Sequence, residues 1–390
     1  MPSASVQPQA SNPKAGESVD AKSIKLFTPV TCKSVTFKNR IVVPPMCMYS
    51  ATDGFFNDFH LSHYASFAYK GVGMIIIEAT AVESRGRISP HDGGLWSDEH
   101  IAPLKRIVDL IKTQGTIPAI QLAHSGRKAD MSSIWNGYKL VPESEGGWPN
   151  DIVGPSEVPF NDRHGKPRSL TIEELQAVKQ SWVDATIRAD KAGIEVVEVH
   201  IAHGYLLQSF LSGHSNKRTD IYGGSLENRM RYPLEVVKAV RDIWPANKPL
   251  WVRISGTDFK TVDPLARDED GWDIYQSIEF SKALKKLGID VIDVSGGGNR
   301  SDAVYPTGKL YQVSMAETIK KEAGIATGAV GKIIDPKDAE AILQEEKADF
   351  VLVGREHLRE PGWLNHAARE FGVKTVWANQ YAAANASLIF

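Results

Sequence analysis

The stretch Glu195-Val-Val-Glu-Val-His-Ile-Ala-His-Gly-Tyr205 joins a short run rich in β-branched residues to a group of polar side chains. The run has the length and composition of a buried strand. Seven similar runs occur elsewhere in the chain, at residues 40–43, 73–78, 117–122, 250–254, 291–294, 326–330 and 349–353. Longer segments separate the eight runs, and this alternation is typical of parallel βαβ units.

The segments between the runs carry helical periodicity, most clearly at residues 100–114, 171–192, 233–243, 274–287 and 336–346. Thr171 and Glu174 form a capping box, which predicts a helix start. Eight strand and helix pairs with nearly continuous apolar strands predict an α/β fold, a single-domain (β/α)8 TIM barrel. A Rossmann fold is the alternative, and it is weakened because no Gly-x-Gly-x-x-Gly follows the first run.

The predicted barrel covers residues 23–370 and has an extension at each end. Residues 1–22 are rich in Ser, Pro, Ala and Gln and lack the apolar core and basic start of a signal peptide. We therefore expect them to be a disordered extension. Residues 27–38 predict a small hairpin that closes the barrel bottom, and residues 371–390 form a C-terminal tail.

A long loop, residues 129–153, follows the third run. It contains Pro and Gly residues together with Trp135 and Trp148. Loops of this size are usually functional lids or binding loops, so substrate preference is expected to be set here.

The composition excludes several classes of function. The 390 residues are 42% hydrophobic and 24% charged, with a net charge of −2, which indicates no broad attraction to nucleic acid or to an anionic membrane. No apolar run approaches the roughly 20 residues that span a bilayer. Cys32 and Cys47 are too few for a disulfide framework, a four-cysteine zinc site or an iron–sulfur cluster. These features favour a cytoplasmic protein.

Polar side chains gather where the fourth run ends, and the active site of a barrel forms at the carboxyl ends of its strands. His200 and His203 can aim two N–H donors at one oxygen, which stabilises negative charge developing on a carbonyl. The Tyr205 hydroxyl can act as a proton donor. Two other interpretations remain: a pair of satisfied core histidines, or a zinc site with His124 and Glu198 that lacks a recognisable metal spacing.

Three further strand ends carry groups suited to anions. Arg253 lies in an apolar run and cannot lose its proton, so it must meet an anion, either a reduced flavin or a structural carboxylate. The last two runs end in Gly328-Ala-Val-Gly331 and Gly354-Arg355, where barrels commonly hold a phosphate. These glycines could equally serve only tight turns.

Several motifs together resemble one known family. They include Pro45-Met-Cys-Met-Tyr49, Gln121-Leu-Ala-His-Ser-Gly-Arg-Lys128, Ala329-Val-Gly331 and the very specific stretch Asn216-Lys-Arg-Thr-Asp-Ile-Tyr-Gly-Gly-Ser-Leu-Glu-Asn-Arg229. From about residue 26 to about residue 363 the chain is similar to the old yellow enzyme family. Within it, the chain most resembles the NADPH dehydrogenase or xenobiotic reductase branch of FMN-dependent ene-reductases.

This resemblance implies an activity and a set of site residues. NADPH would reduce FMN, and hydride would then pass to the C=C bond of an enone, enal or nitroalkene. Tyr49, His200 and His203 would face the substrate, and Tyr205 would protonate its α-carbon. The residues expected around FMN are Pro44, Pro45, Met46, Cys47, Ala79, Gln121, Arg253, Gly298, Gly331, Gly354 and Arg355.

The C-terminal tail departs from the pattern of this branch, because residues 380–390 contain no arginine to reach a neighbouring subunit's site. The resemblance therefore leaves open a monomer or a homodimer. The related dienoyl-CoA reductase type requires an iron–sulfur cluster, which two cysteines cannot hold. A barrel that binds FMN without turnover and a metal-dependent hydrolase are the alternatives from other classes.

Overall fold

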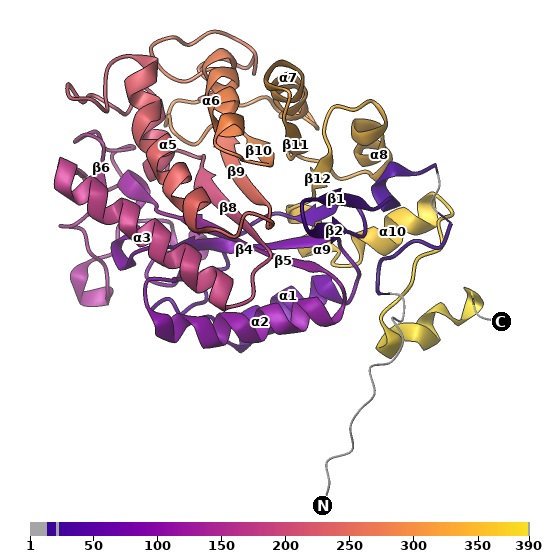
Figure 1. Ribbon diagram of the computed structural model, residues 1–390. Coiled ribbons are helices and arrows are strands. Elements are labelled where there is room, and N and C mark those ends of the chain that lie inside the picture. Colours follow the sequence, from indigo (N-terminus) through magenta and orange to yellow (C-terminus); the bar gives the residue numbers. More distant parts are fainter. Residues whose placement is uncertain (1–13, 21–22, 389–390) are drawn as a thin grey trace, which may run out of the picture.

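Eight parallel strands close into a barrel in this computed structural model, which describes residues 14–20 and 23–388 (Figure 1). All eight strands expected from the sequence are present, and their order around the barrel is β10-β11-β12-β3-β4-β5-β8-β9. Their bounds are β3 Ile41–Val43, β4 Met74–Ala81, β5 Ile117–Ala123, β8 Val196–Ile201, β9 Leu250–Ser255, β10 Val291–Ser295, β11 Ala326–Ala329 and β12 Phe350–Leu352. The predicted TIM barrel is therefore confirmed.

Helices surround the barrel, as its parallel strands require. The principal ones are α1 Asp58–Ala68, α2 Ile101–Thr113, α3 Ile172–Lys191, α5 Leu226–Ile243, α6 Ile274–Lys286, α7 Val313–Ala323, α8 Pro336–Gln344 and α10 Trp363–Glu370. Two short helices, α4 Leu206–Leu211 and α9 Arg355–Arg359, follow β8 and β12 directly. Thr171 caps α3 with the expected capping box.

Helix α5 begins earlier than the sequence pattern indicates. The periodicity predicts a start at Pro233, but the helix begins at Leu226 and contains Pro233 in its interior. Ser225 is the N-cap, and its side chain accepts a hydrogen bond from the Asn228 N–H. The cap thus sets the start, and the proline interrupts a pattern that continues on both sides.

The lower part of the barrel interior is apolar. Its side chains come from successive strands and include Val42, Met74, Ile76, Ala119, Val196, Trp251, Val291, Phe350 and Leu352. Below them lies an antiparallel hairpin, β1 Val30–Cys32 and β2 Val35–Phe37. The Phe37 ring lies 6.1 Å from the Trp251 ring and 5.1 Å from the Phe350 ring. The hairpin therefore closes the barrel bottom, as predicted.

A polar layer lies directly above this apolar layer. Side chains alternate between the inside and the outside of a strand, so the residue two positions further on faces the interior again. Two positions beyond Ala119, Val196, Trp251 and Val291 come Gln121, Glu198, Arg253 and Asp293. All four are buried. The interior thus changes from apolar to charged at one level, toward the carboxyl ends of the strands.

Residues 14–20 contradict the expected disorder of residues 1–22. The Gly16 N–H donates to the Val376 carbonyl over 2.8 Å, and the Val19 N–H donates to the Lys374 carbonyl over 2.9 Å. The neighbouring Ala15 is buried. Pairing with the C-terminal segment satisfies backbone groups that composition alone left without partners. Residues 1–13 and 21–22, also expected to be disordered, lie outside the described residues.

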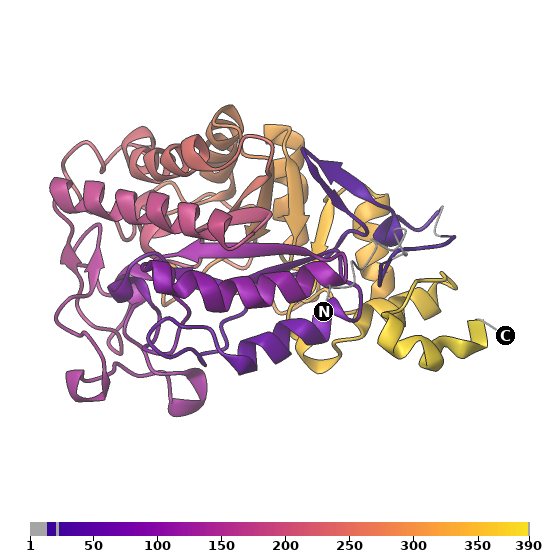
Figure 2. The same ribbon diagram turned by 60° about the horizontal axis from the view of Figure 1, so that its bottom comes forward.

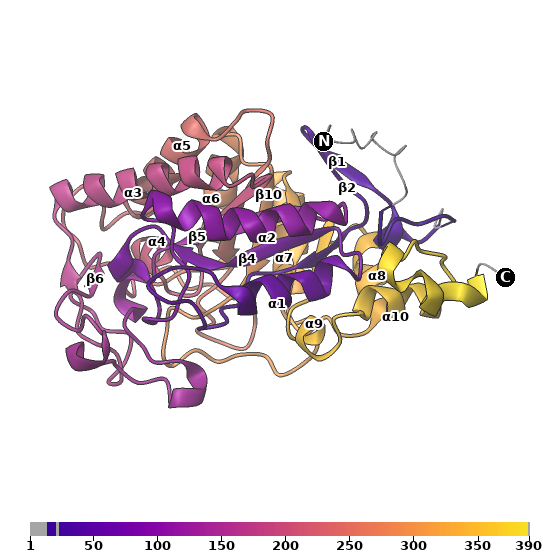
Figure 3. The ribbon, with the colours of Figure 1, turned by 90° about the horizontal axis from the view of Figure 1, so that it is seen from below.

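The two ends of the barrel differ in what covers them. The hairpin and the yellow C-terminal segment lie at one end (Figure 2). At the opposite end, the long connection between β5 and β6 Val153–Gly154 extends beyond the strands (Figure 3). It holds three short turns of 3-10 helix, Gly126–Lys128, Ile134–Asn136 and Glu143–Glu145. Among the helices of residues 14–20 and 23–388, none is long and apolar enough to cross a membrane.

Candidate active site

The structure brings the predicted trio of His200, His203 and Tyr205 together at the end of β8. The ring of His200 lies 5.2 Å from that of His203 and 5.1 Å from that of Tyr205. Burial, followed by the positive charge of Arg253, lowers the pKa of both histidines well below the usual value. Burial raises the pKa of Tyr205 well above its usual value. At neutral pH all three groups are therefore uncharged.

The two imidazoles differ in their hydrogen bonds. His203 Nε2 lies 2.7 Å from Ser295 Oγ, and Ser295 Oγ lies 3.2 Å from Gln312 Oε1. Because the serine donates to this carbonyl oxygen, it accepts from His203, which places the proton of His203 on Nε2. His200 Nδ1 is buried and has no partner among the described residues. Of the two predicted donors, His203 therefore has its Nε2 occupied by the protein, whereas the buried Nδ1 of His200 has no protein partner within the described part of the chain.

Lys128 holds the turn that carries Tyr205, a role that was not expected from the sequence. Its Nζ donates to the carbonyls of His203 and Gly298, each over 2.9 Å, and lies 5.1 Å from the Tyr205 ring centroid. His203 has a φ of +61°, an unusual conformation for a non-glycine residue. Burial lowers the pKa of Lys128 to about 7. Its place in the 121–128 motif was the one available signal.

A cavity of about 370 Å³ opens at the carboxyl ends of the strands beside this trio. Eight of the predicted residues line it: Pro44, Pro45, Met46, His203, Arg253, Gly331, Gly354 and Arg355. Arg253 lies in β9, and the others follow the ends of β3, β8, β11 and β12, so separate strands converge on one space. Sequence reasoning missed other lining residues, among them Tyr311, Gln312, Lys332 and Arg359.

The remaining predicted residues lie around the cavity without lining it. Ala79 and Tyr205 line a smaller hollow. Cys47 is buried, and this burial raises the pKa of its thiol well above the usual value. A Cβ on Gly298 would lie 2.5 Å from the Cα of His203, so this glycine packs against the turn. The Tyr49 ring lies 5.7 Å from the ring of Trp135, which belongs to the long loop.

Arg253 forms an ion pair with a carboxylate inside the protein. Its Nε lies 3.0 Å from Asp293 Oδ2, and both side chains are buried. The second interpretation left open by the sequence, a structural carboxylate, is therefore realised. Arg253 also lines the cavity, so its positive charge acts both on Asp293 in the barrel interior and on the cavity.

The glycines that follow the last two strands leave room in the cavity for a ligand to lie close to the protein backbone. A Cβ on Gly354 would come within 3.3 Å of Pro44 Cγ, and a Cβ on Gly331 would come within 3.1 Å of the Gln312 side chain. Gly331 also has a φ of +122°, which side-chain-bearing residues rarely adopt. With Arg355 and Lys332 nearby, these features fit a bound phosphate. The residues present therefore fit FMN.

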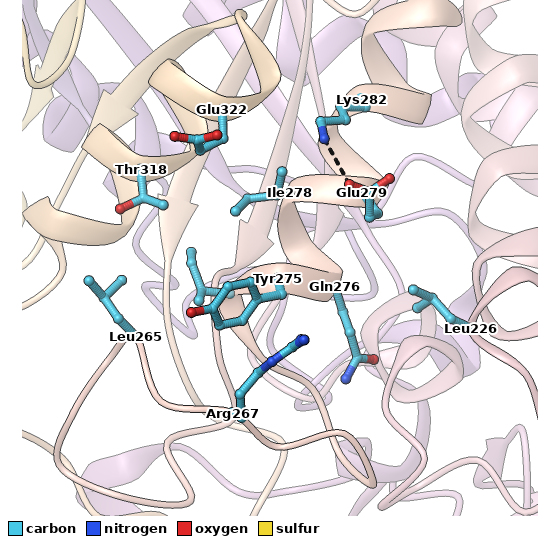
Figure 4. A pocket seen from close by; sticks show the side chains of 11 residues that line it. Leu226, Leu265, Arg267, Tyr275, Gln276, Ile278, Glu279, Lys282, Thr318 and Glu322 are labelled. Carbon is cyan, nitrogen blue, oxygen red and sulfur yellow. Dashed lines mark hydrogen bonds and ion pairs between the residues drawn. The ribbon is translucent and has the colours of Figure 1, made fainter.

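A larger hollow lies elsewhere, on the helical shell (Figure 4). It measures about 540 Å³ and is lined mainly by α6, where Lys282 pairs with Glu279 over 2.8 Å. The Arg267 guanidinium stacks 3.9 Å from the Tyr275 ring. No predicted site residue lines this hollow. Among the described residues, no group of three or more His, Cys, Asp or Glu side chains is arranged to hold a metal ion.

The sequence pattern of the NADH:flavin oxidoreductase / NADH oxidase family matches residues 25–372, nearly the whole barrel. The chain belongs to this family. It is the old yellow enzyme family that the motifs resembled, so the protein is an oxidoreductase enzyme. Membership implies a flavin and a nicotinamide as its redox partners.

Relatives of this oxidoreductase span nearly its full length. An NADH:flavin oxidoreductase of Gibberella zeae is 41% identical, over 95% of this chain and 91% of the relative. An NADPH dehydrogenase of Bacillus velezensis is 44% identical, over 92% of this chain and 98% of the relative. The one from Bacillus subtilis is 43% identical, over 92% of this chain and 98% of the relative.

Solved structures of other oxidoreductases share its barrel. Morphinone reductase in complex with tetrahydroNAD superposes with a TM-score of 0.72 at 25% identity, covering 88% of this chain and 90% of that one. The old yellow enzyme homologue from Zymomonas mobilis gives the same TM-score, 0.72, at 24% identity, covering 90% of this chain and 94% of that one. The second likeness concerns the fold alone.

Proposed function

We propose that this oxidoreductase takes electrons from NADPH, carries them on FMN and reduces the C=C bond of α,β-unsaturated carbonyl or nitro compounds. One observation carries the proposal: the His200, His203 and Tyr205 trio stands beside the cavity lined by Arg253, Gly331 and Gly354. The choice of NADPH is supported by the names of the Bacillus relatives.

The cavity residues would hold FMN by complementary charge and close approach. Arg355, with the backbone of Gly331 and Gly354, would bind the phosphate. Arg253 and Gln121 would face the flavin ring, with Pro44 to Cys47, Ala79 and Gly298 around it. When bound, FMN supplies a ring that accepts hydride and passes it on.

The trio would act on the substrate. His200 and His203 would hydrogen-bond the carbonyl oxygen, which gains negative charge during reduction, and Tyr49 would pack against the substrate. Because His203 Nε2 bonds to Ser295, its contribution requires either that this bond be exchanged for one to substrate or that the ring proton move to Nδ1. Tyr205, neutral at physiological pH, holds the proton that would go to the α-carbon.

The long loop would exclude water from this space. Trp135 packs edge-on against Tyr49 and is itself exposed, so it can cover a bound substrate. We assign residues 129–153 the role of a lid on this basis. Small-molecule enones, enals and nitroalkenes are the proposed partners, and the functional unit is a monomer or a homodimer.

The test is an anaerobic titration of the purified, FMN-loaded protein. NADPH should bleach the flavin absorbance, and a cyclic enone or nitroalkene should restore it with one equivalent of product. A protein that binds FMN and is never bleached by NADPH would contradict the electron donor. Bleaching without recovery by any activated alkene would contradict the ene-reductase activity.

A further inference from the structure

Two carboxyl groups face each other inside the barrel, directly below the candidate site. Glu198 and Asp293 belong to the polar layer and are completely buried. They come from β8 and β10, which lie on either side of β9, and inward side chains of alternate strands meet in one layer. They are close enough to share a hydrogen bond.

The surroundings of this pair supply too few donors for two ionised groups. Gln121 Nε2 donates to Glu198 Oε1 over 2.8 Å, and the ion pair from Arg253 reaches Asp293 Oδ2 at 3.0 Å. Glu198 Oε2 and both oxygens of Asp293 receive no well-aligned hydrogen bond from the described residues. Buried carboxylate oxygens without donors are strongly destabilising.

The charge count gives the same result. Arg253 is the single cation in contact with the two carboxyl groups among the described residues, and His200 and His203 above it are neutral. Two carboxylates against one guanidinium would leave a net negative charge in the barrel interior. One proton on the pair neutralises the excess negative charge and supplies a hydrogen-bond donor between the two carboxyl groups.

We propose that Glu198 is a neutral carboxylic acid that donates its proton to an ionised Asp293 and thereby fixes Arg253 below the flavin cavity. The hydrogen bonds identify which acid is protonated. Gln121 occupies Glu198 Oε1 as a donor, which leaves Oε2 to carry the proton, whereas Arg253 favours the charged form of Asp293. Burial and the neighbouring Asp293 also raise the pKa of Glu198 well above its usual value. Glu198 is thus a positioning residue.

The protonated acid controls how much positive charge Arg253 presents to the cavity. With one carboxylate below it, the positive charge of Arg253 is neutralised by one negative charge. With two carboxylates, the negative charge would exceed the positive charge. A site with only one carboxylate beside Arg253 is better able to accept negative charge on a flavin ring. This consequence rests on the proposed function, whereas the protonation of Glu198 is a property of the protein without FMN.

The first test measures the proton directly in the FMN-free protein by infrared spectroscopy. Glutamate labelled with carbon-13 should shift a protonated-carboxyl C=O band in the wild type. In an E78Q background, which removes the other buried glutamate with a raised pKa, the band should persist at neutral pH, where an ordinary glutamate is ionised. It should vanish in E198Q and remain in E279Q, since Glu279 is exposed and paired with Lys282.

Two results would overturn the assignment. One is the absence of a labelled glutamic acid band in the wild type at that pH, a measurement that needs no variant to fold. The other is a band that shifts with labelled aspartate instead, which would place the proton on Asp293.

The second test compares flavin reduction potentials of FMN-loaded variants. E198Q should match the wild type, because a glutamine amide also accepts from Gln121 and donates to Asp293. D293N removes the negative charge beside Arg253 and should shift the potential to a higher value. A rise of equal size in E198Q would show that Glu198 is charged and would contradict the proposal. Failure to bind FMN would count against the proposed function and leave the infrared result standing.

Discussion

Tyr205 stands at the end of β8, with His200 beside its ring and the Lys128 ammonium over its face. The sequence could place this tyrosine at a strand end, because an apolar run followed by polar residues marks the carboxyl edge of a barrel strand. It could not supply the contact from Lys128, which bonds to the carbonyls of His203, 75 residues away, and Gly298, 170 residues away. Such long-range contacts have no local pattern.

Replacing Tyr205 by Phe tests the proton-donor role at this scale. Y205F should slow the oxidative half-reaction with an enone by roughly 10²- to 10⁴-fold, the usual contribution of a positioned general acid. Bleaching of the flavin by NADPH should be nearly unchanged, because no proton is transferred to substrate carbon in that step. Stopped-flow measurement of both half-reactions decides the matter, and an equal loss in both would refute the assignment.

Glu78 gives the enzyme a pH-dependent stability. Its carboxyl accepts hydrogen bonds from the Met48 N–H over 3.0 Å and the Tyr64 hydroxyl over 2.8 Å, and burial raises its pKa to about 8. The folded protein therefore keeps a proton that the unfolded chain releases above its ordinary pKa of 4.5. The free energy of unfolding should fall between these two pH values, by at most about 1.4 kcal/mol per pH unit from this residue.

The variant E78Q isolates this contribution. Denaturant unfolding across the same pH range should show a weaker decline in E78Q than in the wild type, because glutamine has no proton to lose. Parallel profiles in the two proteins would mean that Glu78 does not titrate as its burial indicates.

At the scale of the elements, strands were easier to predict than helix starts. Each strand is buried on both faces, so its apolar run is nearly continuous and visible in the sequence. Helix α5 shows the opposite case: Pro233 suggested a start, but the Ser225 cap sets the start about two turns earlier. Tyr311, Gln312 and Lys332, which line the cavity, were missed for a similar reason, since they lie in loops, which carry no periodicity.

The cap of α3 gives an element-scale prediction. Thr171 accepts a hydrogen bond from the Glu174 N–H, and the Glu174 carboxylate accepts one from the Thr171 N–H. T171A should lower the free energy of unfolding by about 1 kcal/mol, because an N–H at the helix start loses its partner. T171S keeps the hydroxyl and should behave like the wild type in denaturant unfolding. Equal losses in both variants would point to packing of the threonine methyl instead.

The proposed lid, residues 129–153, gives a second prediction at the scale of the elements. W135A removes the edge-on ring contact with Tyr49, which is worth about 0.5–1.5 kcal/mol, and should raise the KM for a cyclic enone about two- to tenfold. Flavin reduction by NADPH serves as an internal reference. The matched control is I134A, which truncates an equally exposed neighbour in the same turn. If I134A raised the KM as much, the effect would belong to the loop and not to the Trp135 ring.

At the scale of the whole molecule, the barrel separates stability from chemistry along its axis. The apolar layer and the hairpin lie at the bottom, while the polar layer and the cavity lie toward the carboxyl ends of the strands. Phe37 therefore contributes to stability without touching the site. F37A should lower the free energy of unfolding by about 3–5 kcal/mol, because it opens a cavity against Trp251 and Phe350.

The exposed neighbour Thr36 provides the comparison for Phe37. T36A should change the free energy of unfolding by no more than about 0.5 kcal/mol, as is usual for exposed positions. The flavin reduction potential of F37A should equal that of the wild type. A shifted potential would show that the lower layer also shapes the site.

The pairing of residues 14–20 with the chain around Val376 ties an early segment to a late one at the barrel bottom. For protein engineering, this arrangement offers a handle. A tether attached at the exposed positions Val19 or Lys374 would orient the molecule with its active-site cavity facing away from a support or an electrode. With the residues before 14 and after 376 removed, a short peptide linker between the same two segments would give a circular permutant whose new ends could be opened in an exposed loop of the helical shell.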